Sequence, residues 1–593
     1  MRLDHAAVGN GRILALVSPQ GSVDWLCLPR FDSPSVFARI LDEQQGGSFG
    51  IVPDAAPATG TLSYLTNTNV ACTVFEQGEH AWEIIDFAPR FPDGLGVRCP
   101  LELIRLIRPR AGRPLLRIEF DPRPEYAQVR PELREAGRGI EVGSGSRLSL
   151  VSNLPASYIL GGRSFALDQP VFLALRYGSN ENAPSVARVQ HDLEMTVAGW
   201  RAWARTCALS VFRPELVLRS ALCLKLHASE DTGAVIAAAT TSIPEAMGTQ
   251  RTWDYRYCWL RDAAFVTEAL QRLSYLNEGE RFMRFLRDVA ERGPLQPVYG
   301  IDGERDLEEK MLPHLAGFRG NGYVRVGNAA YAQQQHDLMG EMILCLEALL
   351  TDPRLVHDDA LTYLPLVRRL VEKAIRLAPV PDMGIWEFRT MLRPYTFSRA
   401  MCWVAMARGA QLARLLGEPA LAADWEARAK VERAEILRRA WCQSRNCFTQ
   451  ALDGEAPDAA NLLLPSIGLL DARDPRFLAT LDTYEEHLVD RGLMLRYRNL
   501  DDLGTTTSAF SICTFWWAAA LAQAGRLEKA IEVFDRMTAH ANGVGLFSED
   551  VDPATGDLLG NFPQAYTHVG LIHAATTIGS LLEARNGHLL AWN

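Results

Sequence analysis

The sequence predicts two domains, an N-terminal β-sandwich over residues 1–210 and a mainly helical domain over residues 211–593. The chain has 593 residues, which exceeds the size at which a single hydrophobic core usually stops growing. Apolar and polar residues alternate through much of the first 210 positions, as they do in β-strands. Beyond about residue 190 apolar residues recur every three to four positions, which is typical of amphipathic helices.

The strand-rich part is predicted from period-2 runs separated by turn residues. Residues 12–17 and 23–28 flank the sequence Ser-Pro-Gln-Gly-Ser, which favours a hairpin. Further strands are predicted at residues 101–107, 115–120, 157–160 and 171–177. Many short strands with Gly and Pro turns, and almost no helical stretches, favour a β-sandwich.

The helical part begins with a predicted helical linker from about residue 186. Helices are then predicted at residues 261–273, 329–350, 361–377, 398–416, 421–440, 508–524, 527–540 and 568–584, and several stop near Gly or Pro. At least ten helices are consistent with helix pairs closed into a toroid. An α-solenoid would give the same periodicity, although the sequence has no tight internal repeat.

The composition narrows the classes of partner. A net charge of −10 argues against nucleic acid, because phosphate binding needs a basic face. No apolar run is long enough to span a bilayer, and the first residues lack the pattern of a signal peptide. Eleven cysteines without a CxxC pair fit reduced thiols. We therefore expect a cytoplasmic protein without membrane or nucleic-acid partners, and homo-oligomer formation stays open.

Two acidic loops far apart in the sequence hold the candidate catalytic residues. Glu387 follows Gly-Ile-Trp, and Glu549 follows Leu-Phe-Ser. Hydrolysis of a glycosidic bond uses such a pair, because one carboxylic acid protonates the leaving oxygen while the other carboxylate activates water or attacks carbon. An apolar neighbour such as Trp386 favours the protonated acid by desolvation. Because the chain holds 71 acidic residues, many such pairs arise by chance. The catalytic interpretation therefore depends on the surrounding sequence.

That surrounding sequence resembles glycoside hydrolase family 15, which includes glucoamylases, glucodextranases and a group of microbial trehalases. One matching block is TWDYRYCWLRDA, and it belongs to five blocks that match in order along both predicted domains. The blocks lie at residues 21–37, 252–263, 299–304, 324–330 and 560–568. The resemblance implies an N-terminal β-sandwich, a C-terminal (α/α)6 barrel with a pocket at one mouth, and inversion at the anomeric carbon.

The resemblance also implies roles for the two acidic loops. Glu387 matches the general acid, and Glu549 matches the general base that accepts a proton from the attacking water. Many relatives have two successive glutamates where this chain has Glu549 and Asp550, so Asp550 is the alternative base. An inverting pair predicts carboxyl groups about 6.5–9.5 Å apart. Gln564 and His568 follow the base loop and are candidates either to orient water or sugar or to pack.

Sugar binding is expected from an Arg-Asp pair and three tryptophans. In the family, the residues that match Arg261 and Asp262 hold hydroxyls of the terminal glucose, which suits a guanidinium donor fork and a carboxylate acceptor. A structural ion pair that caps the helix is the alternative. Trp253, Trp259 and Trp386 are candidates to stack on sugar or to belong to the core. The sequence has no HExxH motif or comparable metal spacing, and the catalytic pair requires neither metal nor organic cofactor.

These features predict an inverting, exo-acting α-glucoside hydrolase that releases glucose from a small saccharide. The absence of a secretion signal favours trehalose, since starch is normally met outside the cell. A glucoamylase-type enzyme acting on maltooligosaccharides or isomaltose is the alternative. A disaccharide phosphorylase and a non-catalytic sugar-binding protein are more remote, because both glutamates are retained. Residues 393–399 depart from the commoner family pattern and therefore give no guide to the substrate.

Overall fold

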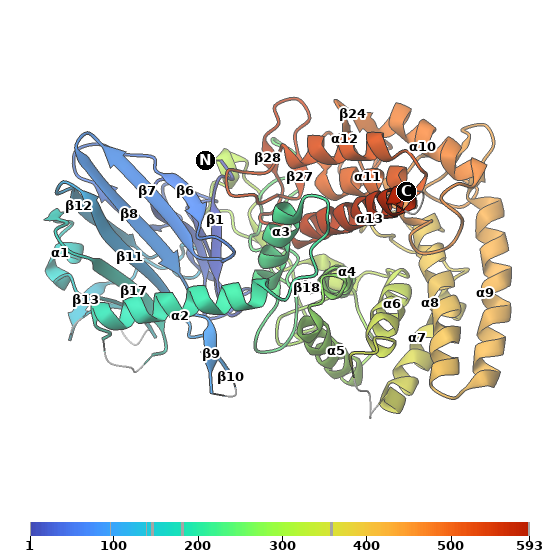
Figure 1. The fold of residues 1–593 in the computed structure, drawn as a ribbon, viewed down its shortest axis with the longest axis horizontal. Coiled ribbons are helices and arrows are strands. Elements are labelled where there is room, and N and C mark those ends of the chain that lie inside the picture. Colours follow the sequence, from blue (N-terminus) through green and yellow to red (C-terminus); the bar gives the residue numbers. More distant parts are fainter. Residues whose placement is uncertain are drawn as a thin grey trace.

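The computed structural model describes residues 2–94, 96–137, 139–143, 147–179, 183–355 and 360–590, with only the backbone of 586–590. Figure 1 shows the strands of the N-terminal part gathered on one side and the helices that follow on the other. The predicted order, a sheet-rich part followed by a helical part, is confirmed. Among the described residues, no helix combines the length and the apolar character that crossing a membrane requires.

The N-terminal part contains two large antiparallel sheets. The first has the order β1-β2-β3-β5-β12-β16, with β4 paired to β3. Its strands are β1 (Ala6–Gly9), β2 (Leu14–Val17), β3 (Ser22–Cys27), β4 (Ser35–Phe37), β5 (Ser48–Pro53), β12 (Leu115–Asp121) and β16 (Phe165–Ala166). The second sheet has the order β13-β14-β15-β17-β11-β8-β7-β6. Its strands are β6 (Thr61–Tyr64), β7 (Ala71–Gln77), β8 (His80–Phe87), β11 (Glu102–Ala111), β13 (Leu133–Ala136), β14 (Gly139–Val142), β15 (Leu148–Ser152) and β17 (Val171–Tyr177).

The two sheets share one hydrophobic core. In β12, Leu116, Ile118 and Phe120 are buried while the residues between them are more exposed, as expected of a strand with one face on a core. Side chains of both sheets, among them Phe49 and Trp82, belong to the same buried cluster. The alternation read from the sequence therefore located β2, β3, β11, β12 and β17.

The strand predicted at residues 157–160 is wrong, because these residues lie in the short helix α1 (Ala156–Leu160). Pro155 precedes the helix, and Ala156 and Ile159 are its buried residues. A spacing of three places both side chains on one helix face, whereas in a strand they would point to opposite faces. Only one residue in this stretch is β-branched, so the propensity for a strand is weak.

The helices of the C-terminal part are long and mostly match the predicted ranges. They follow the linker helix α2 (Val186–Ala204) and are α3 (Pro214–His227), α4 (Leu260–Arg272), α5 (Leu276–Glu291), α6 (Leu338–Leu350), α7 (Leu364–Leu377), α8 (Thr396–Leu415), α9 (Pro419–Arg439), α10 (Pro475–Leu488), α11 (Ser511–Gln523), α12 (Leu527–Thr538) and α13 (Ala565–Leu590). Contacts run from α13 to α4, then to α6 and α8, and through the short helix η4 (Ala459–Leu463) to α11 and back to α13.

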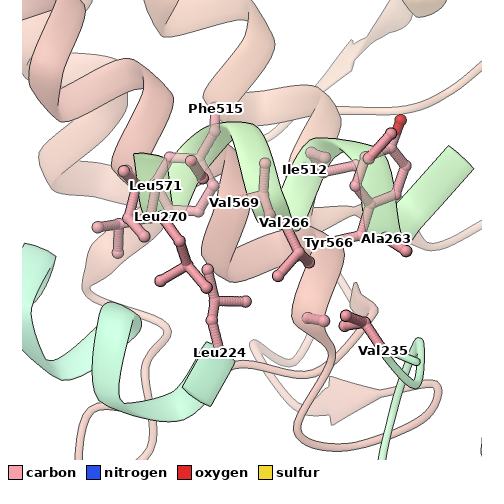
Figure 2. Close-up of a cluster of buried hydrophobic side chains, with 14 of the residues drawn as sticks. Leu224, Val235, Ala263, Val266, Leu270, Ile512, Phe515, Tyr566, Val569 and Leu571 are labelled. Carbon is pink, nitrogen blue, oxygen red and sulfur yellow. The ribbon is translucent and has the colours of Figure 1, made fainter. Parts of the chain in front are cut away.

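Three of these helices pack together in the core next to the pocket described below. Figure 2 shows Val266 and Leu270 of α4, Phe515 of α11 and Val569 of α13 in one cluster. Helix α11 is buried from Ser511 to Ala522, so it lies inside the helical part and not on its surface. This core fixes the direction of α4 and α13, whose first residues enter the site.

The predicted helix at residues 329–350 starts too early. The regular helix α6 begins only at Leu338, and residues 329–332 form the short 3₁₀ helix η2 (Ala329–Ala332). The side chain of Asn328 accepts a hydrogen bond from the Ala330 N–H, which starts this separate turn. Alanines at residues 329, 330 and 332 resemble a helical pattern in the sequence, but Gln333 after them has extended backbone angles and ends the turn.

A buried ion pair ties the N-terminal part to the segment that leads into α4. The Arg256 guanidinium is fully buried and lies 2.6 Å from Asp254. It donates to the Ser33 carbonyl at 2.7 Å and to the Tyr126 hydroxyl at 2.8 Å, both in the N-terminal part. Because a buried charge needs a partner and satisfied donors, this contact sets the position of the segment.

We expect Arg256→Met to lower the free energy of unfolding by about 3–5 kcal/mol, because Asp254 would stay buried without its cation. Urea and thermal unfolding measure this change. Arg428→Met is the matched control, since its ion pair with Asp424 is exposed and such pairs contribute little. Equal stability of the Arg256→Met variant and the control would contradict the anchoring role.

Candidate active site

Most of the predicted site residues line a single pocket in the helical part. Trp253, Trp259, Arg261, Trp386 and Glu387 face it. Asp262 lines it as well, together with residues from stretches 237–262, 328–333, 385–389, 496–510 and 564–566. Glu549 is not among the lining residues. Segments separated by hundreds of positions thus converge on one pocket, which includes Glu387 but leaves Glu549 outside its lining.

Exposure changes steadily along this pocket. Arg261 and Asp262 are each 7% exposed and Tyr566 is 4% exposed. The Glu387 side chain is 21% exposed, and Leu503 is 38% exposed. The pocket therefore has a buried floor around Arg261, an intermediate level at Glu387 and a solvent-exposed rim at Leu503.

Glu387 is held by three donors on one oxygen. Trp259 Nε1, Arg261 Nη2 and Gln335 Nε2 donate to Glu387 Oε1 at 2.7, 3.0 and 3.1 Å. Oε2 receives no hydrogen bond from the residues that the structure describes. A proton on this carboxyl group is therefore carried by Oε2, since Oε1 is occupied as an acceptor.

The backbone of Glu387 adopts an unusual conformation. Its φ angle is +59°, in the left-handed region that residues other than glycine rarely occupy. The turn is held by a hydrogen bond from the Glu387 N–H to the Gly384 carbonyl, and Gln333 donates to the Glu387 carbonyl at 3.1 Å. Strain of this kind persists where the surroundings hold a functional group in place.

Arg261 orients Glu387 from the first turn of α4. Its Nη1 donates to Gln335 at 3.0 Å and to Asp337 at 3.2 Å, while its Nε lies 3.6 Å from Asp262 Oδ2. Arg261 Nε and Asp262 Oδ2 have no hydrogen-bond partner among the described residues. Burial raises the pKa of Asp262 to about 6, against the opposing effect of Arg261. Arg261 and Asp262 thus form a buried ion pair at the pocket floor.

The three predicted tryptophans form rigid walls, because each indole N–H donates to a carboxylate. The acceptors for Trp253, Trp259 and Trp386 are Glu245, Glu387 and Asp458, at distances of 2.7, 2.7 and 2.9 Å. The Arg325 and Arg389 guanidinium carbons lie 5.0 and 4.6 Å from the centre of the Trp253 ring. These contacts fix all three rings before any ligand binds.

Glu549 lies fully buried behind the pocket wall. The Tyr255 hydroxyl, which belongs to the lining, donates to Glu549 Oε1 at 2.8 Å, and the Asn561 N–H donates to Oε2 at 3.3 Å. The Tyr255 ring packs edge-on against Trp259 with centroids 5.3 Å apart, and Trp259 donates to Glu387. Tyr255 and Trp259 therefore connect the two predicted catalytic carboxyl groups.

The glycine after β28 (Leu558–Leu559) makes room for Glu549. Gly560 has a φ angle of +70°, and a Cβ atom there would lie 2.5 Å from the Glu549 Cβ. Any larger residue would displace the carboxylate or the loop. The packing of Glu549 thus gives a physical reason for the glycine at the start of the block at residues 560–568.

Three buried carboxyl groups crowd around Arg496. Glu245 accepts a hydrogen bond from Arg496 Nη2, and Asp550 Oδ1 lies 3.9 Å from the same nitrogen. Burial, Glu245 and Asp550 raise the pKa of Glu549 well above its usual range, while Arg496 opposes the shift. Burial raises the pKa of Asp550 to about 8. Both carboxyl groups therefore keep a proton to higher pH than an exposed carboxyl group does.

The sequence did not single out several residues that build this site. Glu245, Gln335 and Arg496 each come from outside the recognised blocks, so no local motif marks them. Tyr255 lies inside the block at residues 252–263, and its aromatic character was the available signal. Of the two further candidates, Gln564 lines the pocket. His568 is fully buried and accepts from the Phe547 N–H at 3.3 Å, so it supports the base loop from behind.

The site carries no arrangement typical of a metal centre. Within the described ranges, no group of three or more His, Cys, Asp or Glu side chains is placed to hold a metal ion. The pocket supplies instead paired carboxyl groups, fixed aromatic rings and guanidinium groups. Such a set binds hydroxyl-rich ligands and supports proton transfer.

Comparison with known proteins gives consistent matches along the chain. The family model described as glycosyl hydrolases family 15 matches residues 212–576, and a trehalase-like N-terminal model matches residues 3–157. The chain is 34% identical to a trehalase of Thermoplasma volcanium, covering 99% of this chain and 94% of that protein. It is 35% identical to a trehalase of Mycolicibacterium smegmatis, covering 97% and 91% of the two chains.

A solved structure matches over the whole chain as well. The crystal structure of a bacterial glucoamylase complexed with acarbose superposes with a TM-score of 0.69 and covers 99% of this chain and 96% of that chain. The two sequences are 15% identical, so the likeness shows a shared fold. A sheet-rich N-terminal domain followed by a helical C-terminal domain is that fold.

We expect Asp550→Asn to flatten the pH dependence of stability between about pH 4 and 8. The folded-state pKa of Asp550, about 8, exceeds the ordinary value of 3.8, so the unfolded chain loses this proton first and stability falls as pH rises across that window. Asparagine resembles the protonated acid and cannot ionise. Thermal unfolding of the wild type and the variant from pH 4 to 9 measures the effect, with the surface variant Asp552→Asn as control. A wild-type slope that survives in Asp550→Asn would contradict this account.

Proposed function

The chain belongs to glycosyl hydrolase family 15, and within that family we propose that it is an inverting, exo-acting hydrolase that releases glucose from trehalose. The observation that carries this proposal is the similarity to proteins named trehalase, which extends over both domains. The likeness to a glucoamylase rests on the fold alone. Trehalose is therefore favoured over maltooligosaccharides or isomaltose as the substrate.

In the proposed mechanism, the terminal sugar enters the pocket first and lies at its floor. The ion pair of Arg261 and Asp262, whose Nε and Oδ2 atoms lie 3.6 Å apart, holds hydroxyls of this sugar. The walls at Trp253, Trp259 and Trp386 hold the ring. A pocket that is buried at one end accepts a chain end and not the middle of a chain, which explains exo action.

Two proton transfers complete the reaction. Glu387 protonates the glycosidic oxygen through Oε2, the oxygen that Trp259, Arg261 and Gln335 leave unoccupied. Glu549 accepts a proton from the attacking water, and we assign this role to Oε2, whose one hydrogen bond from the described residues is the 3.3 Å bond from Asn561. The water attacks carbon as the leaving oxygen departs from the opposite face, so the configuration inverts. The two carboxyl groups are expected about 6.5–9.5 Å apart.

A phosphorylase reaction on this scaffold is disfavoured by the charges of the pocket. Phosphorolysis needs cations that can accept phosphate, whereas the lining arginines in the described structure are all engaged by carboxylates. Arg251 pairs with Asp501, Arg261 with Glu387, Arg389 with Glu309 and Arg496 with Glu245. A non-catalytic binding protein would not need the strained backbone at Glu387 or the cradle at Gly560.

We also infer the finer architecture and the setting of the enzyme. The helices α4, α6, α8, α11 and α13, with η4, would form the inner ring of an (α/α)6 barrel, which the circular order of their contacts supports. The two N-terminal sheets would form a β-sandwich over residues 1–210, joined through α2 to the catalytic domain over 211–593. A cytoplasmic location fits a small sugar as substrate.

We expect Glu387→Gln and Glu549→Gln each to reduce kcat for trehalose by about 10²–10⁴-fold, because each removes one of the two proton transfers. Glucose release from trehalose, maltose, isomaltose and maltotriose is the measurement. Glu308→Gln is the matched control, since its side chain is exposed and does not line the pocket. Wild-type turnover in either catalytic variant would overturn the mechanism, and a preference for maltotriose over trehalose would overturn the substrate.

We expect Glu245→Gln to move the acidic limb of the kcat/KM profile to lower pH. The base works only when ionised, so activity is lost as pH falls through the raised pKa of Glu549. Removing the neighbouring charge of Glu245 lowers that pKa. The profile from pH 4 to 9, with Glu119→Gln as a surface control, measures the shift. A limb that stays in place or moves upward would contradict the influence of Glu245 on Glu549.

A further inference from the structure

The pocket rim carries a surface loop, residues 498–504, that bridges two walls. Asp501, Asp502 and Leu503 of this loop line the pocket, and Leu500 is 70% exposed. The loop therefore has one side on the pocket and the other in solvent. Asp501 and Asp502, which bind different partners, hold the loop in this position.

Asp502 fastens the loop to the segment that contains Glu387. The Arg389 N–H donates to Asp502 Oδ2 at 2.5 Å, and the Thr390 N–H donates to Oδ1 at 3.1 Å. The Thr390 hydroxyl donates to Oδ1 as well. One carboxylate thus satisfies three donors of two consecutive residues, and hydrogen bonds to a charged acceptor are stronger than neutral ones.

Asp501 fastens the same loop to two other lining residues. Arg251 Nη2 donates to both oxygens of Asp501 at 2.6 and 2.7 Å, and the Tyr497 hydroxyl donates at 2.6 Å. Arg251 also lies 3.9 Å from Glu245, beside the predicted base. The loop is consequently held at two adjacent residues, Asp502 by the segment that follows Glu387 and Asp501 by Arg251 and Tyr497.

The bridge lies on the side of the leaving group. Glu387 protonates the oxygen between the two sugars, so residues nearer the floor contact the terminal sugar and residues nearer the rim contact the sugar that leaves. Arg389, two positions after Glu387, has a side chain 34% exposed, and Leu503 is 38% exposed. Asp502 and its partners therefore border the space for the leaving sugar. This assignment rests on the proposed function.

We propose that Asp502 is a specificity-determining residue that limits the leaving group to a single sugar. By holding loop 498–504 against the Glu387 segment, it keeps the rim closed around one ring. The second sugar of a disaccharide fits within the closed rim. A maltooligosaccharide would have to continue through the position of the loop, so its additional sugars are excluded.

The test compares substrates of increasing length in three variants. Asp502→Ala removes all three bonds to the Glu387 segment, and Thr390→Val removes the hydroxyl donor alone while keeping the shape of the side chain. Asp471→Ala is the control, because Asp471 accepts a backbone N–H of an exposed loop and does not line the pocket. The readout is kcat/KM for trehalose, maltose, maltotriose and maltopentaose, with KM and kcat reported separately.

We expect Asp502→Ala to raise the ratio of maltotriose to trehalose kcat/KM by roughly five- to tenfold, the equivalent of one or two hydrogen bonds. The change should come mainly from a lower KM for maltotriose, since the loop would no longer exclude its additional sugar and the contact is remote from the reacting atoms. Thr390→Val should shift the ratio in the same direction by a smaller factor, and Asp471→Ala should leave it unchanged.

An unchanged or lower ratio in a folded Asp502→Ala variant would overturn the proposal. So would a shift of the same size in the Asp471→Ala control. A wild-type enzyme that prefers maltotriose would instead overturn the substrate assigned above. The wild-type measurement alone shows this outcome, before any variant is compared. Thermal unfolding of each variant establishes that the comparison is made on folded protein.

Discussion

The hydrogen bond from the Arg261 guanidinium to Glu387 is the contact on which the rest of the site depends. It joins the first turn of α4 to a strained loop 126 positions away. The backbone pairing of Trp259 with Val298 and the bond from the Leu260 N–H to the Pro297 carbonyl set the start of the helix. Because a buried guanidinium is stable only with carboxylate partners, the positions of Asp337 and Glu387 are fixed together with it.

The charged groups of the pocket gather around two buried guanidinium groups, each with carboxyl partners. Arg261 faces Asp262, Asp337 and Glu387, and Arg496 faces Glu245, Glu549 and Asp550. At each centre, acidic groups outnumber the cation, so burial is only partly offset. The pKa values of Asp262, Glu549 and Asp550 are therefore raised. A site of this kind holds both proton donors and proton acceptors near neutral pH, which acid–base hydrolysis of a sugar bond requires.

The sequence predicted the order of the elements because burial gives strands and long helices different periods. It failed where a short segment offered too few positions to show its period, as at residues 157–160, and where alanines imitated a helix before Leu338. In the site, Arg261 was found because it belongs to a recognisable block, and Glu387 because it follows Trp386 in an apolar loop. Glu245 and Arg496 were not, since they lie 251 positions apart and only the folded chain places them together. The depth of the pocket and the bridge made by Asp502 are likewise properties of tertiary structure.

The anomeric form of the first products tests the central claim most directly. Trehalose joins two α-glucose units through their anomeric carbons, and an inverting hydrolase changes the configuration of only the one that water attacks. Proton NMR during the first minutes of hydrolysis should therefore show equal amounts of α- and β-glucose, before mutarotation mixes them. The appearance of α-glucose alone would indicate retention and contradict the assignment of Glu387 and Glu549 as an acid and a base acting through water.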